Sequence, residues 1–319
     1  MKRFPIAALF LLFAMMLLCS GCNRSQQVSS GKLQVVTTLF PLYDFARAIA
    51  GTKGDVTMLL PPGVEPHSFE PKPDDIVRIN NAGLFIYTNR YMEPWAVTIL
   101  KGVYQNTLKV VDAGQGVTYL KAGEGHGHES NADHDAEHHA GGMDPHIWLD
   151  FGNAQLMVAN ILNGFLAADP ANGEYYRKNA AVLSAALADL DQRYRSGLES
   201  CASREILHGG HYAFGYLAHR YGLKYRAMTG VSSESEPSAA GMAAMVERIK
   251  RDKAHYIFAE ELLSPRLTDT LANEAGVGVL KLNGAHNVSK TDFQRGVTFI
   301  DLMNENLKNL QKGLSCRAR

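Results

Sequence analysis

The stretch Leu33-Gln-Val-Val-Thr-Thr-Leu-Phe-Pro-Leu-Tyr-Asp-Phe-Ala-Arg-Ala-Ile-Ala-Gly51 contains the two elements from which the fold is built. Its β-branched start, 33–38, predicts a strand, and the amphipathic run 42–50 predicts a helix that ends at Gly51. Alternating strands and helices predict a parallel sheet with helices on both faces. The same order recurs with strands at 55–60, 84–88 and 108–111 and with helices at 73–81 and 95–101.

The second half of the chain repeats this alternation after a long helical segment. Apolar residues at helical spacing predict a helix at 153–168 and another at 174–198, the latter about 37 Å long at about 1.5 Å per residue. That length suits a connector between two lobes. The expected fold class is therefore α/β, with two parallel-sheet lobes joined by one long helix. The expected pairs of strand and helix are 205–208 with 213–221, 224–228 with 237–252, 255–259 with 265–275, and 278–282 with 293–314.

Three histidines, His67, His146 and His211, each come after a predicted strand, in loops marked by Pro or Gly. Loops at the carboxyl ends of parallel strands are where α/β proteins bind their ligands. Imidazole is the commonest metal-binding side chain, and its nitrogen suits zinc better than magnesium or calcium. The sequence therefore predicts a transition-metal site in the cleft between the lobes. The three segments read Gly63-Val-Glu-Pro-His-Ser-Phe, Met143-Asp-Pro-His-Ile-Trp-Leu-Asp and His208-Gly-Gly-His-Tyr-Ala-Phe-Gly.

A polar segment at 123–142 holds five more histidines. Its Gly, His, Asp and Glu residues cannot form a packed core, but its imidazoles can bind metal weakly. We expect an auxiliary loop that captures or senses metal, with an inert linker as the alternative. Its histidines are His126, His128, His134, His138 and His139.

The first residues predict export. Lys2 and Arg3 precede an apolar run at 6–18, which has the length of a signal-peptide core and is too short to span a bilayer. The run ends in Leu18-Cys-Ser-Gly-Cys22, which resembles a bacterial lipobox whose last cysteine becomes the lipidated N-terminus; a plain secretory signal is the alternative. We expect a lipoprotein signal peptide at 1–21 and a flexible tether at 22–32. The protein would then be held by its N-terminal lipid on the outer side of the cytoplasmic membrane or in the periplasm.

The cysteine count, the charge balance and the motifs bear on the disulfide, the partners and the class of protein to be expected. Cys201 and Cys316 remain after such processing, and two thiols in an oxidising compartment can form a disulfide. The 32 basic and 32 acidic residues balance, so no nucleic-acid partner is expected. Three histidines with one open position would also suit a zinc hydrolase. The sequence has no His-Glu-x-x-His and no phosphate-binding P-loop, which favours a receptor over an enzyme.

The sequence also contains Thr37-Thr-Leu-Phe-Pro-Leu-Tyr-Asp-Phe-Ala, Ser235-Glu-Pro-Ser and Ile257-Phe-Ala-Glu. Together with the three histidine segments, these motifs resemble the metal receptors of bacterial zinc and manganese ABC importers, the zinc-uptake substrate-binding proteins in particular. The resemblance implies two (β/α)4 lobes, at 33–169 and 201–319, joined by a long rigid helix at 170–200, with limited hinge motion. It also implies a monomer that delivers metal to a cognate ABC permease and its ATPase. A zinc buffer or adhesin that acts without a permease is the alternative. The histidine segments match over Leu60-Pro-Pro-Gly-Val-Glu-Pro-His-Ser-Phe-Glu-Pro, Asp144-Pro-His-Ile-Trp-Leu-Asp and His211-Tyr-Ala-Phe-Gly-Tyr-Leu-Ala-His-Arg-Tyr-Gly-Leu.

The same resemblance implies a ligand set. The first two ligands of the family match His67 and His146. The third is His in zinc receptors and Glu in many manganese receptors, and here it is His211, so Zn²⁺ is favoured over Mn²⁺. Many relatives supply an Asp as the fourth ligand where this chain has Asn283-Gly-Ala-His286. The candidates for that position are His286 and Glu260, then Glu65 or a water molecule.

Overall fold

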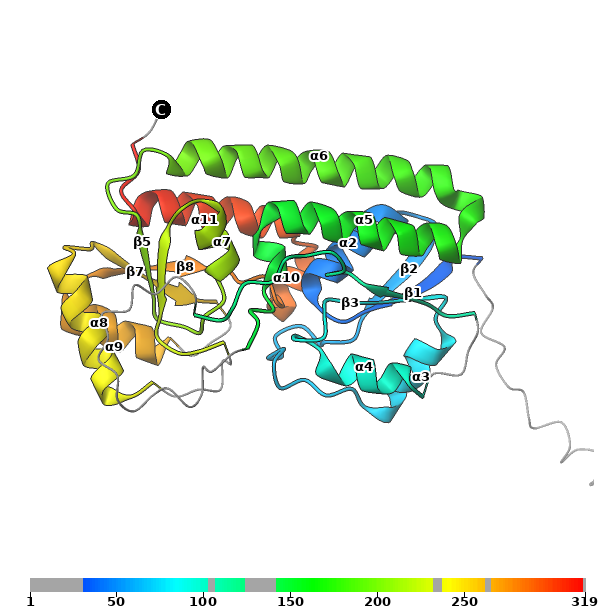
Figure 1. The fold of residues 1–319 in the computed structure, drawn as a ribbon, viewed down its shortest axis with the longest axis horizontal. Coiled ribbons are helices and arrows are strands. Elements are labelled where there is room, and N and C mark those ends of the chain that lie inside the picture. The colour runs from blue at the N-terminus through cyan, green and yellow to red at the C-terminus, as the bar shows by residue number, and fades with distance from the viewer. Residues whose placement is uncertain (1–30, 103–106, 124–141, 232–236, 262–264, 318–319) are drawn as a thin grey trace, which may run out of the picture. The chain divides into compact units, whose positions relative to one another are not determined.

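The computed structural model describes residues 31–102, 107–123, 142–231, 237–261 and 265–317. Within these ranges it contains two four-stranded parallel sheets, each with helices on both faces (Figure 1). We call the parts built on these sheets the first and the second lobe. The predicted α/β fold with two lobes is confirmed.

The first lobe has the strand order β2-β1-β3-β4. Helices α2 and α5 cover one face of its sheet, and α3 and α4 cover the other. Its strands are β1 (Leu33–Thr37), β2 (Gly54–Met58), β3 (Leu84–Tyr87) and β4 (Lys109–Asp112). Its helices are α2 (Phe40–Ala50), α3 (Pro73–Asn81), α4 (Pro94–Leu100) and α5 (Phe151–Ala168), the last preceded by the 3₁₀ turn η2 (Ile147–Leu149).

The second lobe repeats this arrangement with the order β6-β5-β7-β8. Helices α8 and α9 pack on one face of its sheet, and α7 and α11 lie on the other. Its strands are β5 (Glu205–His208), β6 (Lys224–Ala227), β7 (Tyr256–Glu260) and β8 (Gly278–Leu282). Its helices are α7 (Gly215–Arg220), α8 (Ala239–Arg251), α9 (Arg266–Ala275), α10 (Lys290–Arg295) and α11 (Phe299–Gly313).

Alternation along the strands explains why both faces of each sheet are covered. In β1, Val35 belongs to the core beneath α2 and α5, whereas Val36 belongs to the core beneath α3 and α4. Successive side chains of a strand point to opposite faces. A strand that is apolar at consecutive positions therefore needs a helix on each side, as in other parallel sheets.

The long helix α6 (Gly173–Leu198), preceded by the 3₁₀ turn η3 (Pro170–Asn172), joins the two lobes as predicted. It packs along α5 and α2 of the first lobe and along α11 of the second (Figure 1). The ring centre of Phe151 lies 4.8 Å from that of Tyr194 on α6 and 6.2 Å from that of Phe299 on α11. One apolar core thus passes from lobe to lobe beneath this helix, and Leu33–Arg319 form one compact unit. No helix in the described part of the chain is both long and apolar enough for a bilayer crossing.

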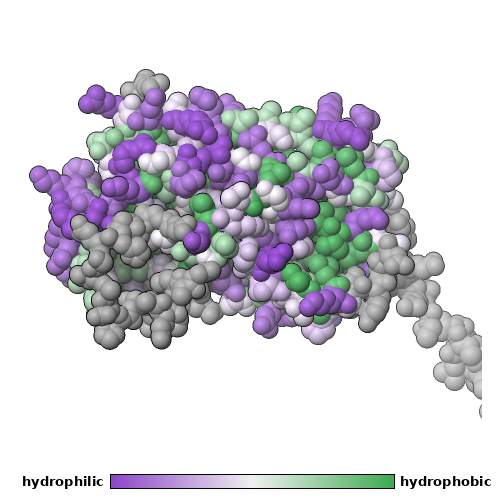
Figure 2. Space-filling model, viewed as in Figure 1, coloured by the Kyte–Doolittle hydropathy of each residue, from purple (hydrophilic) through white to green (hydrophobic). Residues whose placement is uncertain are grey.

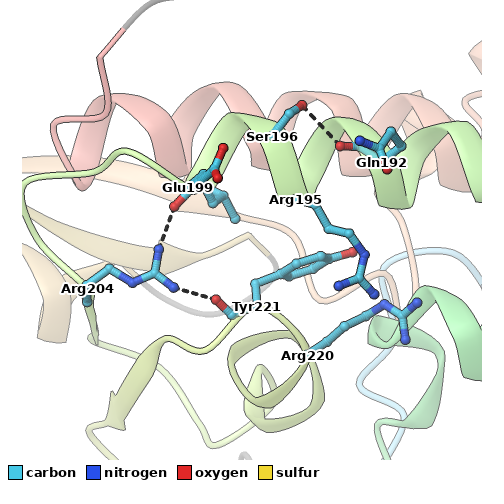
Figure 3. Close-up of a pocket in the computed structure, with 8 residues that line it drawn as sticks. Gln192, Arg195, Ser196, Glu199, Arg204, Arg220 and Tyr221 are labelled. Carbon is cyan, nitrogen blue, oxygen red and sulfur yellow. Dashed lines mark hydrogen bonds between the residues drawn. The ribbon is translucent and has the colours of Figure 1, made fainter.

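An ion cluster also ties the two lobes to α6. Arg220, at the end of α7, donates to both carboxylate oxygens of Asp191 on α6, each at 2.7 Å. It also donates at 2.6 Å to Asp150, the residue that caps α5. Figure 3 shows Arg220 and Arg195 extending toward the same groove, which has a volume of about 470 Å³ and lies beside Tyr221. None of the predicted metal ligands lines this groove.

The surface is uneven in polarity. On the face shown in Figure 2, apolar side chains gather over the first lobe and polar ones over the second. Val77 of α3 and Val97 of α4 are among the exposed apolar residues of the first lobe. Single exposed apolar residues are normal on globular proteins, so these two need no functional explanation.

Two details of the predicted helices are wrong. The single helix expected at 293–314 is two helices, because Gly296 takes a left-handed φ of 71° after α10 and Thr298 begins α11. The hydroxyl of Thr298 accepts from the backbone N–H of Asp301, whose carboxylate accepts from the N–H of Thr298 in return. Val182, one of the apolar residues within the predicted helix at 174–198, is 66% exposed and does not join the core. The apolar spacing at 293–314 continues across the break between α10 and α11, which Gly296 and the Thr-x-x-Asp pattern mark.

The two remaining cysteines close the second lobe. Cys201 follows α6, Cys316 follows α11, and the structure joins them in a disulfide across 115 residues. Backbone hydrogen bonds from Ala202 to Ser315 and from Ser203 to Leu314 lie beside it. The two ends of the second lobe are therefore fastened together.

Removing this disulfide should destabilise the protein. A bond that closes a loop of 115 residues restricts the unfolded chain, and its loss typically lowers the free energy of unfolding by about 2–5 kcal/mol. We expect that loss for the double variant Cys201→Ser/Cys316→Ser, measured by urea unfolding without zinc. Reductant should lower the free energy of unfolding of the unaltered protein to that of the variant, and it should not change the stability of the variant. Equal stability of the two proteins without reductant would contradict this expectation.

Candidate metal centre

Four histidines meet between the lobes. Their ligand nitrogens all lie within 4.8 Å of one another. His67 comes from the loop after β2, His146 directly precedes η2, and His211 lies between β5 and α7. His286 comes from the loop after β8. The structure therefore brings the three expected histidines together and places one of the candidates for a fourth ligand beside them.

The spacing of the nitrogens fits one tetrahedral ion. Nε2 of His146 is 3.3 Å from Nε2 of His67 and 3.4 Å from Nε2 of His211. Zinc–nitrogen bonds of about 2.0–2.1 Å in a tetrahedron place neighbouring nitrogens about 3.3–3.4 Å apart. The ring of His286 lies 4.7 Å from that of His146 and 5.1 Å from that of His211, centre to centre. Its Nε2 is buried and has no hydrogen-bond partner in the described part of the chain.

The centre is closed on three sides. His146, His211 and His286 are buried, at 0%, 1% and 5% exposure, and only His67 of the four is partly exposed. Trp148 is fully buried, with its ring 5.6 Å from that of His146. Access from solvent is therefore on the His67 side.

Two buried carboxylates stand behind the ligands, one from each lobe. Asp144 accepts from the backbone N–H of His146 at 3.0 Å, and its Oδ1 lies 2.7 Å from Nδ1 of the same residue. Oε2 of Glu260, at the end of β7, lies 2.6 Å from Nδ1 of His211. A carboxylate that accepts from Nδ1 orients the ring and leaves Nε2 free for a metal. Glu260 therefore lies outside the nitrogen cluster, behind a ligand.

The other residues considered in the sequence lie elsewhere. Glu65 accepts from the N–H and hydroxyl of Ser68, within the loop that carries His67. His208 is buried beneath the centre, with Nδ1 3.1 Å from the hydroxyl of Tyr225. Cys22 and the five histidines of the polar segment lie outside the described residues. Asp144 was not among the sequence candidates, although its place two residues before His146 is the signal that would have found it.

Burial favours the neutral form of three of the four imidazoles. It lowers the pKa of His67 to about 4, assisted by the neighbouring His211, and it lowers the pKa values of His146 and His286 well below the usual range. Burial raises the pKa of Asp144 to about 8. Burial also opposes ionisation of Glu260, but the hydrogen bonds with His211 and the charges of His211 and His208 together outweigh it and lower the pKa of that carboxyl. His67, His146 and His286 are thus in the neutral form that binds metal.

Comparisons with known proteins agree on one family. The family described as zinc-uptake complex component A, periplasmic, matches residues 35–313. The chain is 39% identical to the high-affinity zinc uptake system protein ZnuA of Bacillus subtilis, over 97% of each chain. It is 36% identical to the zinc-binding lipoprotein AdcA of Streptococcus pneumoniae over 92% of its own length, and it spans 58% of that longer protein.

A solved structure shows the same likeness in three dimensions. The crystal structure of the Zn(II)-bound ZnuA-like domain of Streptococcus pneumoniae AdcA superposes with a TM-score of 0.76 at 34% identity. The match covers 89% of this chain and 99% of that domain. The two-lobed arrangement is therefore shared over nearly the whole folded part of the chain.

Acid should displace zinc only at unusually low pH. Protonated imidazole cannot bind a metal, and in this centre His67 is protonated only near pH 4, where its lowered pKa lies. We expect zinc affinity, measured by equilibrium dialysis, to persist from pH 7 to about 5 and to fall as pH approaches about 4. The unfolded chain takes up these protons near pH 6.5, so the zinc-free protein should lose stability as pH falls from about 6.5 to about 4. Loss of most zinc binding already at pH 6.5 would contradict this window.

Proposed function

This chain belongs to the zinc-uptake complex component A family, and we propose that it is a high-affinity extracytoplasmic zinc receptor that delivers Zn²⁺ to an ABC importer. The observation that carries the proposal is the cluster of four histidine nitrogens within 4.8 Å of one another. Zinc is the cargo of such a protein. It binds between the lobes and leaves toward a permease, which is driven by its own ATPase.

The donor set favours zinc over manganese. Manganese prefers carboxylate, carbonyl and water oxygens, whereas imidazole nitrogen suits zinc. The cluster offers four imidazoles and keeps the carboxylate of Glu260 on the outer side of His211. Glu260, whose pKa is lowered, supplies negative charge behind His211 and so offsets part of the charge of a dication.

The same geometry supports a receptor over a hydrolase. A catalytic zinc keeps one coordination position open for water or substrate. The cluster offers four histidine donors within 4.8 Å of one another, and three of them are buried. Four protein donors would complete a tetrahedral ion and leave no coordination position for a reacting water.

We extend the proposal to the segments that the structure does not describe. Cys22 carries the lipid that anchors the protein to the membrane, and the histidines at 124–141 collect zinc for the centre. The two ends of that loop are joined by an antiparallel bridge between Lys121 and Met143, directly before Asp144. The loop therefore begins and ends beside the metal centre, which supports a capturing role.

The ligand set can be tested by substitution. We expect His67→Ala, His146→Ala, His211→Ala and His286→Ala each to lower zinc affinity strongly in competition with a chelator, because each removes a donor. Glu260→Gln should lower it by about 10- to 100-fold, the usual cost of losing a group that orients a ligand. Cobalt(II) bound to the Glu260→Gln variant should keep the visible spectrum of a four-coordinate site.

His219→Ala is the control for this series, because His219 lies exposed on α7. It should bind zinc as the unaltered protein does. An unchanged affinity for His286→Ala, together with a changed cobalt spectrum for Glu260→Gln, would assign the fourth position to the glutamate.

Zinc import itself can be tested in cells that lack this chain and keep its permease. The unaltered gene should restore growth in zinc-poor medium, and the His67→Ala gene should not. The Cys22→Ala protein should appear in the soluble fraction instead of the membrane fraction, and a variant without 124–141 should restore growth except at the lowest zinc concentrations. Growth that is restored equally when the permease is deleted would favour a zinc buffer or adhesin over an importer receptor.

A further inference from the structure

The loop that carries His286 belongs to the second lobe in sequence but is attached to the first. Its backbone carbonyls accept from Phe40 N–H at His286, from Gly63 N–H at Val288, and from the Trp148 indole at Gly284, at 3.2, 2.9 and 2.8 Å. All three donors are in the first lobe. Asn306 of α11 holds the other end of the loop at Asn283. The loop therefore crosses between the lobes at the metal centre.

The conformation of this loop is also costly. Ala285, directly before His286, has a φ of 55°. A non-glycine residue in that left-handed region is strained and persists only where its surroundings hold it. The contacts with the first lobe are the restraints that hold it here.

The side chain of Asn287 lies at the centre of these contacts. It is 1% exposed, and its Nδ2 donates to the carbonyls of both Pro61 and Val64 at 2.8 Å. Its Oδ1 accepts from Val288 N–H at 2.8 Å. A carboxamide has two N–H donors, so both are used on one turn of the neighbouring lobe. That turn leads directly to His67.

The loop that receives these hydrogen bonds needs such a restraint. It runs from the end of β2 at Met58 to the start of α3 at Pro73, and it holds the one ligand that is partly exposed. A longer loop has more conformations to lose before its histidine can occupy one position. The hydrogen bonds of Asn287 exclude many of these conformations. Because Asn287 is adjacent to His286 in the chain, one side chain fixes the distance between His67 and His286.

We propose that Asn287 is a positioning residue for zinc, which holds His67 against His286 and acts through those two ligands. This inference rests on the proposed function. Loss of its side chain leaves all four imidazoles present but lets the His67 loop move, so the donors are no longer arranged in advance for the ion. A variant without this side chain would still bind zinc, but more weakly and with a less regular geometry.

A purely structural amide would behave differently, and the chain offers a matched control. Nδ2 of Asn160 on α5 also donates to two backbone carbonyls, those of Ala113 and Gln115, both at 2.9 Å. Both carbonyls lie at the start of the connection from β4 to η2, more than 30 residues before His146 in the sequence. Asn160→Ala and Asn287→Ala therefore remove the same kind of hydrogen bonds, but only the second touches the metal centre.

The test is a double-mutant cycle read by zinc affinity and by the visible spectrum of bound cobalt(II). We expect Asn287→Ala to weaken zinc binding by about 10- to 100-fold, as is usual for groups that orient ligands, and to alter the cobalt bands. In His67→Ala or His286→Ala backgrounds it should have no further effect on affinity. Asn160→Ala should lower the Tm of the zinc-free protein and leave zinc affinity and the cobalt spectrum unchanged.

Other outcomes overturn the inference in distinguishable ways. If Asn287→Ala weakens binding as much without His67 as with it, or leaves affinity and spectrum unchanged, Asn287 is not a positioning residue although the receptor function stands. If the unaltered protein binds no zinc tightly, the proposed function fails and the inference fails with it. Should Asn287→Ala not fold, Asn287→Ser, which keeps one short donor, takes its place and is held to the same outcomes.

Discussion

Four imidazole nitrogens held close together between the lobes are the constraint on which the rest of this structure depends. Two protonated imidazoles at this distance would repel each other, and neighbouring nitrogens that both present lone pairs cannot hydrogen-bond to each other. Burial resolves the first difficulty, because it lowers the pKa values of His67, His146 and His286. The second difficulty shows at Nε2 of His286, which has no hydrogen-bond partner among the described residues, and a metal bound to that nitrogen would remove it.

The architecture supplies the stiffness that this arrangement needs. Neighbouring elements of both lobes share one core under α6, and the carboxylate of Asp44 on α2 accepts from Phe299 N–H at the start of α11, at 2.8 Å. Together with the ion cluster of Arg220, these contacts fix one lobe against the other. The four histidines can then come from loops far apart in sequence, since the positions of the loops are set by rigid elements.

Much of the fold was predictable, because periodicity is a local property. Alternation of β-branched strands with amphipathic helices gave the right order of elements, and Pro- or Gly-marked loops after strands pointed to three of the four histidines. The fourth position was ambiguous because His286 and Glu260 both follow strands of the second lobe, and a sequence does not say which way a side chain points. The attachment of the His286 loop to the first lobe depends on contacts between residues more than 200 positions apart. No local sequence pattern predicts that attachment.

The disulfide between Cys201 and Cys316 closes the second lobe covalently. All four strands of its sheet lie inside a covalent ring. A receptor that works outside the cytoplasm is exposed to proteases, and a single cut in any loop of this ring leaves two fragments that are still linked through sulfur. The strand that leads to His211 and the one that leads to His286 would stay on one molecule after such a cut. Nicked protein would therefore keep its ligand loops connected, and it would separate into pieces only after both denaturation and reduction.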